Sequence, residues 1–416
     1  MQASVAHATN TQFQLPERIG SFRGEINDVD SHEALPIKLW HEIYGKEIEP
    51  FAQAILRADS AVANRQGVLV QYPELDRDDA PIDAKSVWNM KMEIAPGAFD
   101  LKRRLEVMDF VGTKRQVLFP GMHANYALGL YNKASDPTIF ASITGDRRGY
   151  AKRLLGIYND WCAEESRKEE RIRPTALLLG DTPDEAYENA KSLVKRGVRL
   201  FFLPMDEPLG GVSPAGPELD RLWALLAEAR CPVMGHIAVS ENLLKTLVWR
   251  EAPAFRGWKM GGEFSLDPWT LSNLHLQVQN YIMTMVLGGV FDRHPTLIVG
   301  SAEFTGHWVG PLAENMDRFY GAGGLQNVSA MGDRALKLKP SEYIERNVRV
   351  MCFDFEPVGV YISRYGLKNV FCYASDYPHH EGGKEPINKF LKSLEGHSDE
   401  VLRKFFVENG KDLLPA

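Results

Sequence analysis

The sequence predicts an α/β protein, a (β/α)8 TIM barrel with long insertions after its first and fifth strands. From residue 115 onward, short apolar runs typical of strands alternate with longer amphipathic stretches typical of helices. Strands separated by helices pair in parallel through right-handed crossovers, and eight such units favour a closed barrel. A chain of 416 residues is long enough for this fold with insertions.

Eight segments have the composition expected of strands. They are short and mostly apolar, and several are bounded by glycine or proline. The segments are Ile26–Asp30, Gln116–Pro120, Thr175–Leu179, Val198–Pro204, Pro232–His236, Thr296–Ala302, Val348–Phe353 and Asn369–Ala374. An open doubly wound sheet is the structural alternative, but it favours a glycine-rich phosphate turn after the first strand. Ser31–Pro36 contains no glycine, so the barrel is favoured.

The predicted helices fill the intervals between these strands. A long helix is expected over Arg147–Glu170. The next begins near Thr182, with proline and acidic residues in its first turn, and ends before Gly197. Further helices are expected over Glu218–Ala229 and Val278–Val290.

The chain is predicted to contain one domain. Residues 1–24 are expected to form a loose N-terminal arm, and residues 25–416 the barrel. Insertions at about 35–113 and 238–276 leave the carboxyl ends of strands, so both should lie over the catalytic face, where loops set substrate choice. Their aromatic residues could form an apolar lid, and two lysines could hold a carboxylate. These residues are Trp88, Trp258, Phe264 and Trp269, with Lys91 and Lys259.

Composition excludes several classes of protein. The net charge of −7 argues against a nucleic-acid binder, which usually has a basic domain. No run approaches the roughly 18 apolar residues of a membrane helix, and the polar segment Met1–Pro16 is not a secretory signal. The four cysteines form no C-x-x-C pair and suggest reduced, buried thiols in the cytoplasm. We expect a small-molecule substrate as the partner, and a homo- or hetero-oligomer because such arms often contact another subunit.

Candidate metal ligands and acid–base groups fall at the carboxyl ends of predicted strands one, five, six and eight. They are Asp30, His32, His236, Glu303 and Asp376. Asp30 and His32 are two residues apart on an extended segment and can therefore face the same side. Each residue alone has a simpler explanation, such as a polar strand end, a packed histidine, a structural ion pair or a turn.

Together these residues predict a metal site. Asp30, His32, His236 and Asp376 form a set of two imidazoles and two carboxylates, which balances the charge of one divalent ion. Zn²⁺ is the expected ion, and the ligand types also suit Mn²⁺ or Fe²⁺.

With these motifs in view, the chain resembles the metal-dependent amidohydrolase superfamily. The resemblance is strongest to the amidohydrolase-2 group, which includes aminocarboxymuconate-semialdehyde decarboxylase and related aromatic-acid decarboxylases. It covers nearly the whole chain after the arm. The matching motifs are Ala374–Gly382, Ala302–Glu303 followed by Trp308–Val309 and Met316–Arg318, and Pro96–Asp100 followed by Arg104–Asp109.

The resemblance implies roles for individual residues. Asp376 binds the metal and shuttles a proton, His236 is a ligand, and His32 is the second histidine of the family's H-x-H pair. Asp30 stands in place of the first histidine. Glu303 stands where many members have an acid–base histidine, so it changes the proton-transfer group or adds a ligand.

The expected activity is hydrolysis or non-oxidative decarboxylation of a small carboxylate-bearing substrate. Asp376, Glu303 and His307 are the predicted catalytic residues, and His379 is a candidate to support them. Two alternatives remain open: a non-haem iron oxygenase like the 2-aminoisobutyrate hydroxylase type, and a metal-retaining, non-catalytic partner subunit. Relatives with two metals have D-S-H-x-H, whereas Ala34 occupies the place of the last histidine here, which favours one ion.

Overall fold

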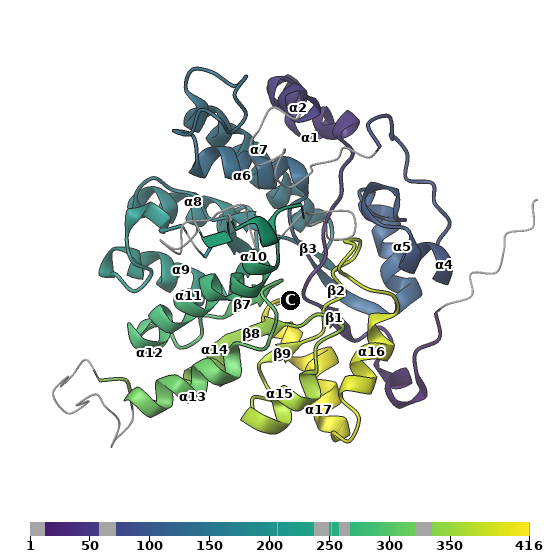
Figure 1. The fold of residues 1–416 in the computed structure, drawn as a ribbon, viewed down its shortest axis with the longest axis vertical. Helices are drawn as coiled ribbons and strands as arrows, with labels where there is room; N and C mark the ends of the chain where they lie inside the picture. Colours follow the sequence, from purple (N-terminus) through teal and green to yellow (C-terminus); the bar gives the residue numbers. More distant parts are fainter. Residues whose placement is uncertain are drawn as a thin grey trace, which may run out of the picture.

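A computed structural model of the chain describes residues 13–57, 72–205, 207–236, 249–250, 252–257, 267–320 and 335–415. Within these residues the protein is a mixed α/β structure with parallel sheets. Figure 1 shows the helices lying around a central group of strands. The predicted alternation of strands and helices is therefore confirmed.

The described strands form two parallel sheets. One sheet has the order β1-β2-β3 and the other runs from β4 to β9 in sequence order. The strands are β1 (Ile26–Asp28), β2 (Thr113–Leu118), β3 (Ile172–Pro174), β4 (Ala176–Leu177), β5 (Phe201–Leu203), β6 (Val233–His236), β7 (Val299–Ala302), β8 (Val348–Met351) and β9 (Phe371–Cys372).

Backbone hydrogen bonds join the two sheets at both edges. Thr175 connects β3 to β4, and its N–H donates to Leu118 O of β2 at 3.0 Å. At the other edge, the N–H of Val29, next to β1, donates to Tyr373 O, next to β9, at 3.1 Å. The first and last strands of the chain are therefore neighbours.

The helices follow the strands in turn. They are α1 (Trp40–Tyr44), α2 (Glu49–Leu56), α4 (Ala84–Asn89), α5 (Leu101–Val111), α6 (Met122–Asn132), α7 (Arg147–Lys168), α8 (Pro183–Lys195), α9 (Asp220–Glu228), α10 (Pro268–Asn273), α11 (His275–Leu287), α12 (Val290–Arg293), α13 (Val309–Tyr320), α14 (Pro340–Asn347), α15 (Val358–Tyr365), α16 (Pro386–Ser393) and α17 (Asp399–Arg403). None of these helices is long and apolar enough to cross a membrane.

Several predicted boundaries shift. The expected strand Thr175–Leu179 lies earlier and is divided, because Arg173 and Pro174 interrupt the apolar pattern without ending the pairing. Within the expected loose arm, Glu17–Phe22 forms a 3-10 helix that buries Ile19, so this part packs on the domain. The segment 35–113 contains α1, α2, α4 and α5, whereas most of 238–276 lies outside the described residues.

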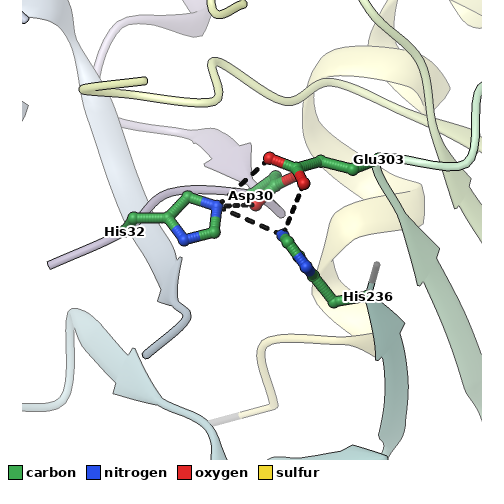
Figure 2. A group of neighbouring side chains, drawn as sticks. All are labelled: Asp30, His32, His236 and Glu303. Carbon is green, nitrogen blue, oxygen red and sulfur yellow. Dashed lines mark hydrogen bonds and ion pairs between the residues drawn. The ribbon is translucent and has the colours of Figure 1, made fainter. Parts of the chain in front are cut away.

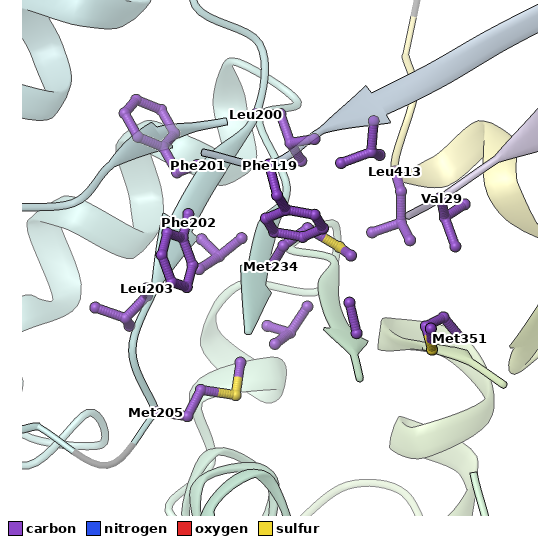
Figure 3. Close-up of a cluster of buried hydrophobic side chains, with 14 of the residues drawn as sticks. Val29, Phe119, Leu200, Phe201, Phe202, Leu203, Met205, Met234, Met351 and Leu413 are labelled. Carbon is purple, nitrogen blue, oxygen red and sulfur yellow. The ribbon is translucent and has the colours of Figure 1, made fainter. Parts of the chain in front are cut away.

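Large apolar side chains pack between the strands. Figure 3 shows Phe119, Phe202 and Met234 packed together, with Leu413 from the C-terminal turn nearby. The ring of His236 lies against Phe119, with 4.4 Å between the ring centroids. The site at the strand ends therefore rests on a dry, packed layer, which holds the imidazole of His236 in place.

Candidate metal centre

Side chains of the metal-binding types gather at the carboxyl ends of the strands. Asp30 and His32 follow β1, His236 ends β6 and Glu303 follows β7. Figure 2 shows these four side chains pointing toward one another. All four are buried. The structure thus brings together residues that are more than 200 positions apart in the chain.

The backbone after β1 places Asp30 and His32 on one side. Ser31, between them, points the other way, and its Oγ donates to Val117 O at 2.5 Å. The N–H of Asp376 donates to Asp30 O at 3.1 Å. The end of β1 is therefore held by β2 on one side and by the segment after β9 on the other.

A first group consists of Asp30, His32, His236 and Glu303, whose potential ligand atoms all lie within 4.8 Å of one another. His32 Nε2 lies 3.3 Å from Asp30 Oδ1 and 3.5 Å from Glu303 Oε1. His236 Nε2 lies 3.2 Å from Glu303 Oε2 and 3.2 Å from His32 Nε2. These nitrogens and oxygens converge on one small volume.

A second group shares two of these residues. It consists of His32, Glu303, Asp376 and His379. His379 Nδ1 lies 3.2 Å from Glu303 Oε1 and 3.2 Å from Asp376 Oδ1, and Asp376 Oδ1 lies 3.7 Å from His32 Nε2. The rings of His32 and His379 stack with centroids 3.6 Å apart. Glu303 therefore joins both groups, with one carboxylate oxygen directed to each.

The carboxylates of the two aspartates form ion pairs with histidines but make no hydrogen bond of good geometry in the described part of the chain: His32 Nε2 lies 3.3 Å from Asp30 Oδ1, and His379 Nδ1 lies 3.2 Å from Asp376 Oδ1. Both carboxylate oxygens of Asp30 and both of Asp376 are buried with no hydrogen-bond partner among the described residues. Burying a carboxylate without a partner is costly, and a cation between the two acids offsets that cost. Carboxylates and imidazoles are ligands for Zn²⁺, Mn²⁺ and Fe²⁺. The side chains present therefore fit a divalent metal ion.

The acids of the site have opposite pKa shifts. Burial raises the pKa of Glu303, but the neighbouring histidines, His236 first among them, outweigh burial and hold this pKa well below its usual value. Burial and the negative charge of Glu303 hold the pKa of Asp376 well above its usual value. Without a cation, two adjacent carboxyl groups do not both ionise readily.

Three non-glycine residues of the site have left-handed backbone conformations. The φ angles are 59° for Glu303, 60° for Thr305 and 53° for Asp376. Each such residue costs on the order of 1–3 kcal/mol, and such strain is often found at functional sites. At Glu303 and Asp376 the backbone therefore turns sharply where the strand ends.

Glu356 holds the loop that follows Glu303. Its carboxylate accepts the N–H of Gly306 at 2.8 Å and the N–H of Phe353 at 2.8 Å. Burial raises the pKa of Glu356 to about 7. The carboxyl group of Glu356 is well hydrogen-bonded. The groups that lower its pKa are backbone N–H groups and the hydroxyl of Tyr361, not the side chain of a basic residue.

A second buried acid–imidazole cluster begins one residue after His32. Glu33 accepts the N–H of Gly121 at 2.8 Å and that of Leu35 at 2.9 Å, and it pairs with His123 Nε2. Tyr44 Oη lies 2.6 Å from His123 Nδ1. Burial raises the pKa of Glu33, but attraction to His123 and these hydrogen bonds outweigh it and lower the pKa below its usual value.

The other predicted site residues are placed differently. His307 is exposed, its Nδ1 lies 2.5 Å from Thr305 Oγ1, and its ring faces His275. It belongs to neither metal-binding group. His379, expected only to support the catalytic residues, lies among the potential ligands. Its position three residues after Asp376 was the available signal. No sequence pattern indicated the Glu33 cluster, because its members are scattered along the chain.

Three residues of the predicted lid, Trp88, Lys91 and Trp269, are among the described residues. Trp88 is buried and packs edge-on against Phe13, so it joins its insertion to the N-terminal arm. Lys91 Nζ donates to Gly383 O at 3.0 Å. Burial lowers the pKa of Lys91, and the negative charge of Asp376 partly opposes this shift. Trp269 lies in α10 and is partly buried. Trp258, Lys259 and Phe264 lie outside the described residues.

The profile of the amidohydrolase family Amidohydro_2 matches residues 134–416, about two thirds of the chain. The chain belongs to this family. Membership confirms both the resemblance described above and the prediction of an enzyme. No curated protein sequence matches this chain.

Solved structures share the fold. An amidohydrolase from Mycobacterium avium subsp. paratuberculosis K-10 is 20% identical, with a TM-score of 0.63 over 94% of this chain and 98% of the other. The 2,6-dihydroxybenzoate decarboxylase from Rhizobium is 15% identical, with a TM-score of 0.56 over 94% and 98%. The 5-carboxyvanillate decarboxylase from Novosphingobium aromaticivorans, complexed with manganese and a nitrobenzoic acid, is 16% identical, with a TM-score of 0.58 over 99% and 100%.

Proposed function

We propose that this protein is a metal-dependent decarboxylase of a small carboxylate-bearing substrate, with its active site at the carboxyl ends of β1, β6, β7 and β9. The observation that supports this most is the buried cluster of imidazoles and carboxylates in which Asp30 and Asp376 have no hydrogen-bond partners among the described residues. The hydrogen bonds that join the two sheets at both edges support a closed eight-stranded barrel, with β3 and β4 counted as one strand.

Asp30, His32, His236 and Glu303 are proposed to hold one divalent ion. The distances favour Glu303 over Asp376 as the fourth ligand, because Glu303 belongs to the first group and Asp376 does not. Zn²⁺ is the ion expected from the sequence, and Mn²⁺ is the ion in the complexed 5-carboxyvanillate decarboxylase. Bound there, the ion would act as a Lewis acid toward substrate oxygens.

The remaining residues handle the proton. In non-oxidative decarboxylation the bond between carbon and the carboxylate breaks, CO2 leaves and a proton takes its place on that carbon. Asp376 borders the ligand group and is paired with His379 at 3.2 Å, so this pair is positioned to deliver the proton. The packed layer under His236 keeps water away from one side of the site.

The proposal of decarboxylation rather than hydrolysis is supported by the two neighbours that are named decarboxylases. Both named decarboxylases act on aromatic acids and share this fold over nearly their whole length. The oxygenase and accessory-subunit alternatives find no support among the comparisons. Assembly as an oligomer and a cytoplasmic location remain predictions from the sequence.

The decisive experiment combines metal analysis with an isotope test. Purified protein is expected to contain about one equivalent of a divalent metal, and His236→Ala is expected to lose it. A panel of hydroxylated aromatic acids is then incubated in D2O, and a substrate should release CO2 and gain deuterium at the carbon that carried the carboxylate. Metal-free wild-type protein with unchanged turnover would refute the metal site, and hydrolysis of an amide or ester without CO2 release would refute the reaction.

A further inference from the structure

Arg104 of α5 is a fully buried cation below the metal centre, with 0% of its surface exposed. A guanidinium has five N–H donors, and each one here has an acceptor. Nε donates to Gly97 O at 2.5 Å, Nη1 to Ser31 Oγ at 3.3 Å and Gln116 Oε1 at 3.2 Å, and Nη2 to His32 O at 2.6 Å and Ala98 O at 3.3 Å. Satisfying every donor in this way requires the planar fork of arginine and is not available to lysine.

Two of these acceptors belong to the strand end that carries the proposed ligands. Ser31 lies between Asp30 and His32, and His32 provides its own carbonyl oxygen. The guanidinium also lies 5.0 Å from the ring centroid of Tyr377, which follows Asp376 directly. One buried side chain therefore contacts the strand end that carries Asp30 and His32 and the strand end that carries Asp376.

Gln116 extends this contact through a chain of hydrogen bonds. It accepts from Arg104 and donates through Nε2 to Asp28 Oδ2 at 2.8 Å. Asp28 accepts the N–H of Ser375 at 2.9 Å and the hydroxyl of Ser375 at 2.6 Å. The sequence of contacts from Arg104 through Gln116 and Asp28 to Ser375 passes beneath the site and ends next to Asp376.

The backbone around Arg104 is shaped to this contact. Gly97 has a φ of 72°, and a Cβ there would lie 2.8 Å from the Cα of Arg104. The turn at Gly97 can thus sit directly on α5 and present two carbonyl groups to the guanidinium. The direct acceptors of Arg104 are all neutral, so this charge is held by hydrogen-bond geometry rather than by a salt bridge.

We propose that Arg104 is a positioning residue for the metal centre. It fixes the end of β1, with Asp30 and His32, against the end of β9, with Asp376, and it couples α5 to both. This inference rests on the proposed function, because it assumes that these side chains bind an ion.

The test compares Arg104→Lys with a matched control. Arg349→Lys is the control, because Arg349 is also buried and hydrogen-bonded, but it lies near the start of β8 and pairs with Asp412. Binding of Mn²⁺ and Co²⁺ is measured by calorimetry, with the absorption spectrum of the Co²⁺ form as a report on ligand geometry. Loss of an outer partner of metal ligands typically weakens binding about 10–100-fold. We expect that loss and an altered spectrum for Arg104→Lys, and wild-type values for Arg349→Lys.

A second variant tests the chain of hydrogen bonds and remains informative if Arg104→Lys does not fold. Asp28→Asn keeps the shape of the side chain, and it should also weaken metal binding. When both variants fold, their effects on metal affinity should be less than additive, because they interrupt the same contacts. Weakening by neither folded variant would overturn the inference, whereas a wild-type protein that binds no ion would overturn the proposed function itself.

Discussion

The metal centre and the Glu33 cluster are both buried groups of acids and imidazoles, and they begin at adjacent residues, His32 and Glu33. Their hydrogen bonding differs. Glu33 has two backbone donors and a histidine partner, whereas Asp30 and Asp376 have no hydrogen-bond partner among the described residues. Backbone N–H groups satisfy Glu33 in addition to its histidine, whereas Asp30 and Asp376 meet only histidine nitrogens, at 3.3 Å and 3.2 Å, among the described residues and fit a cation.

This difference distinguishes a buried charge that stabilises the fold from a buried charge that serves a function. A satisfied pair stabilises the fold and becomes costly only when one member is removed. An unsatisfied group is retained at a cost to stability because it binds something. The contrast can be tested by changing one member of each cluster and following stability and metal content separately.

The largest expected effect comes from removing His123. His123→Ala leaves the carboxylate of Glu33 buried without its imidazole, and breaking such a pair costs about 3–5 kcal/mol. Metal content should be unchanged, because His123 contacts none of the proposed ligands in the described structure. Urea unfolding and metal analysis on the same sample check both statements. Loss of metal from a folded His123→Ala protein would contradict the separation of the two clusters.

Glu356 provides an intermediate case, since it has hydrogen bonds but no imidazole partner. Its folded pKa of about 7 exceeds the usual glutamate value, so the folded state holds the proton more tightly. Its contribution to stability is fully present below about pH 4.5 and is lost as the pH rises through 7, at about 1.4 kcal/mol per pH unit.

The variant Glu356→Gln cannot titrate. We expect its unfolding free energy to gain roughly 3 kcal/mol relative to the wild type between pH 4.5 and pH 8. Denaturant unfolding of both proteins across this range measures the change, and the offset at low pH accounts for lost hydrogen bonds. Parallel pH profiles for the two proteins would show that the pKa of Glu356 is not raised. The exposed residue Glu395 provides a matched control, as Glu395→Gln.

The smallest expected effect concerns Asp376. In metal-free protein, Asp376→Asn removes an acid that lies close to Glu303, and it should raise the unfolding free energy by roughly 1 kcal/mol, as is common when functional residues are neutralised. Glu33→Gln should have the opposite sign, because it weakens a satisfied pair. Thermal melts in the presence of a chelator compare the two variants. A destabilised Asp376→Asn protein would mean that this acid is structural.

Much of the site could be predicted because its pattern is local. Asp30 and His32 alternate on an extended segment, and His236 and Asp376 end apolar runs, so each could be placed at a strand end from its neighbours alone. The position of Glu303 between the two groups could not be predicted. It depends on a left-handed backbone conformation, which the sequence does not indicate at a residue other than glycine. His307 lies about one helical turn after Glu303 in the sequence, but Thr305 between them has a left-handed backbone, and the ring of His307 faces His275.

The contacts of Arg104 and the Glu33 cluster illustrate what local patterns miss. Arg104 lies on an ordinary amphipathic helix, and only the folded structure shows that its donors reach β1. Glu33 and His123 are 90 positions apart, and no spacing rule connects them. The parallel α/β fold was predictable from alternation, whereas long-range polar contacts were not.

The contact between the segments that follow β1 and β9 has a consequence for how the enzyme is made. Asp30 and Asp376 are separated by 346 positions, the difference of their numbers, so the ribosome adds the second long after the first. At about 5–20 residues per second, this interval lasts roughly 20–70 s. Throughout that time the nascent chain lacks Asp376, so the complete set of metal-centre side chains can form only after this late residue has been added.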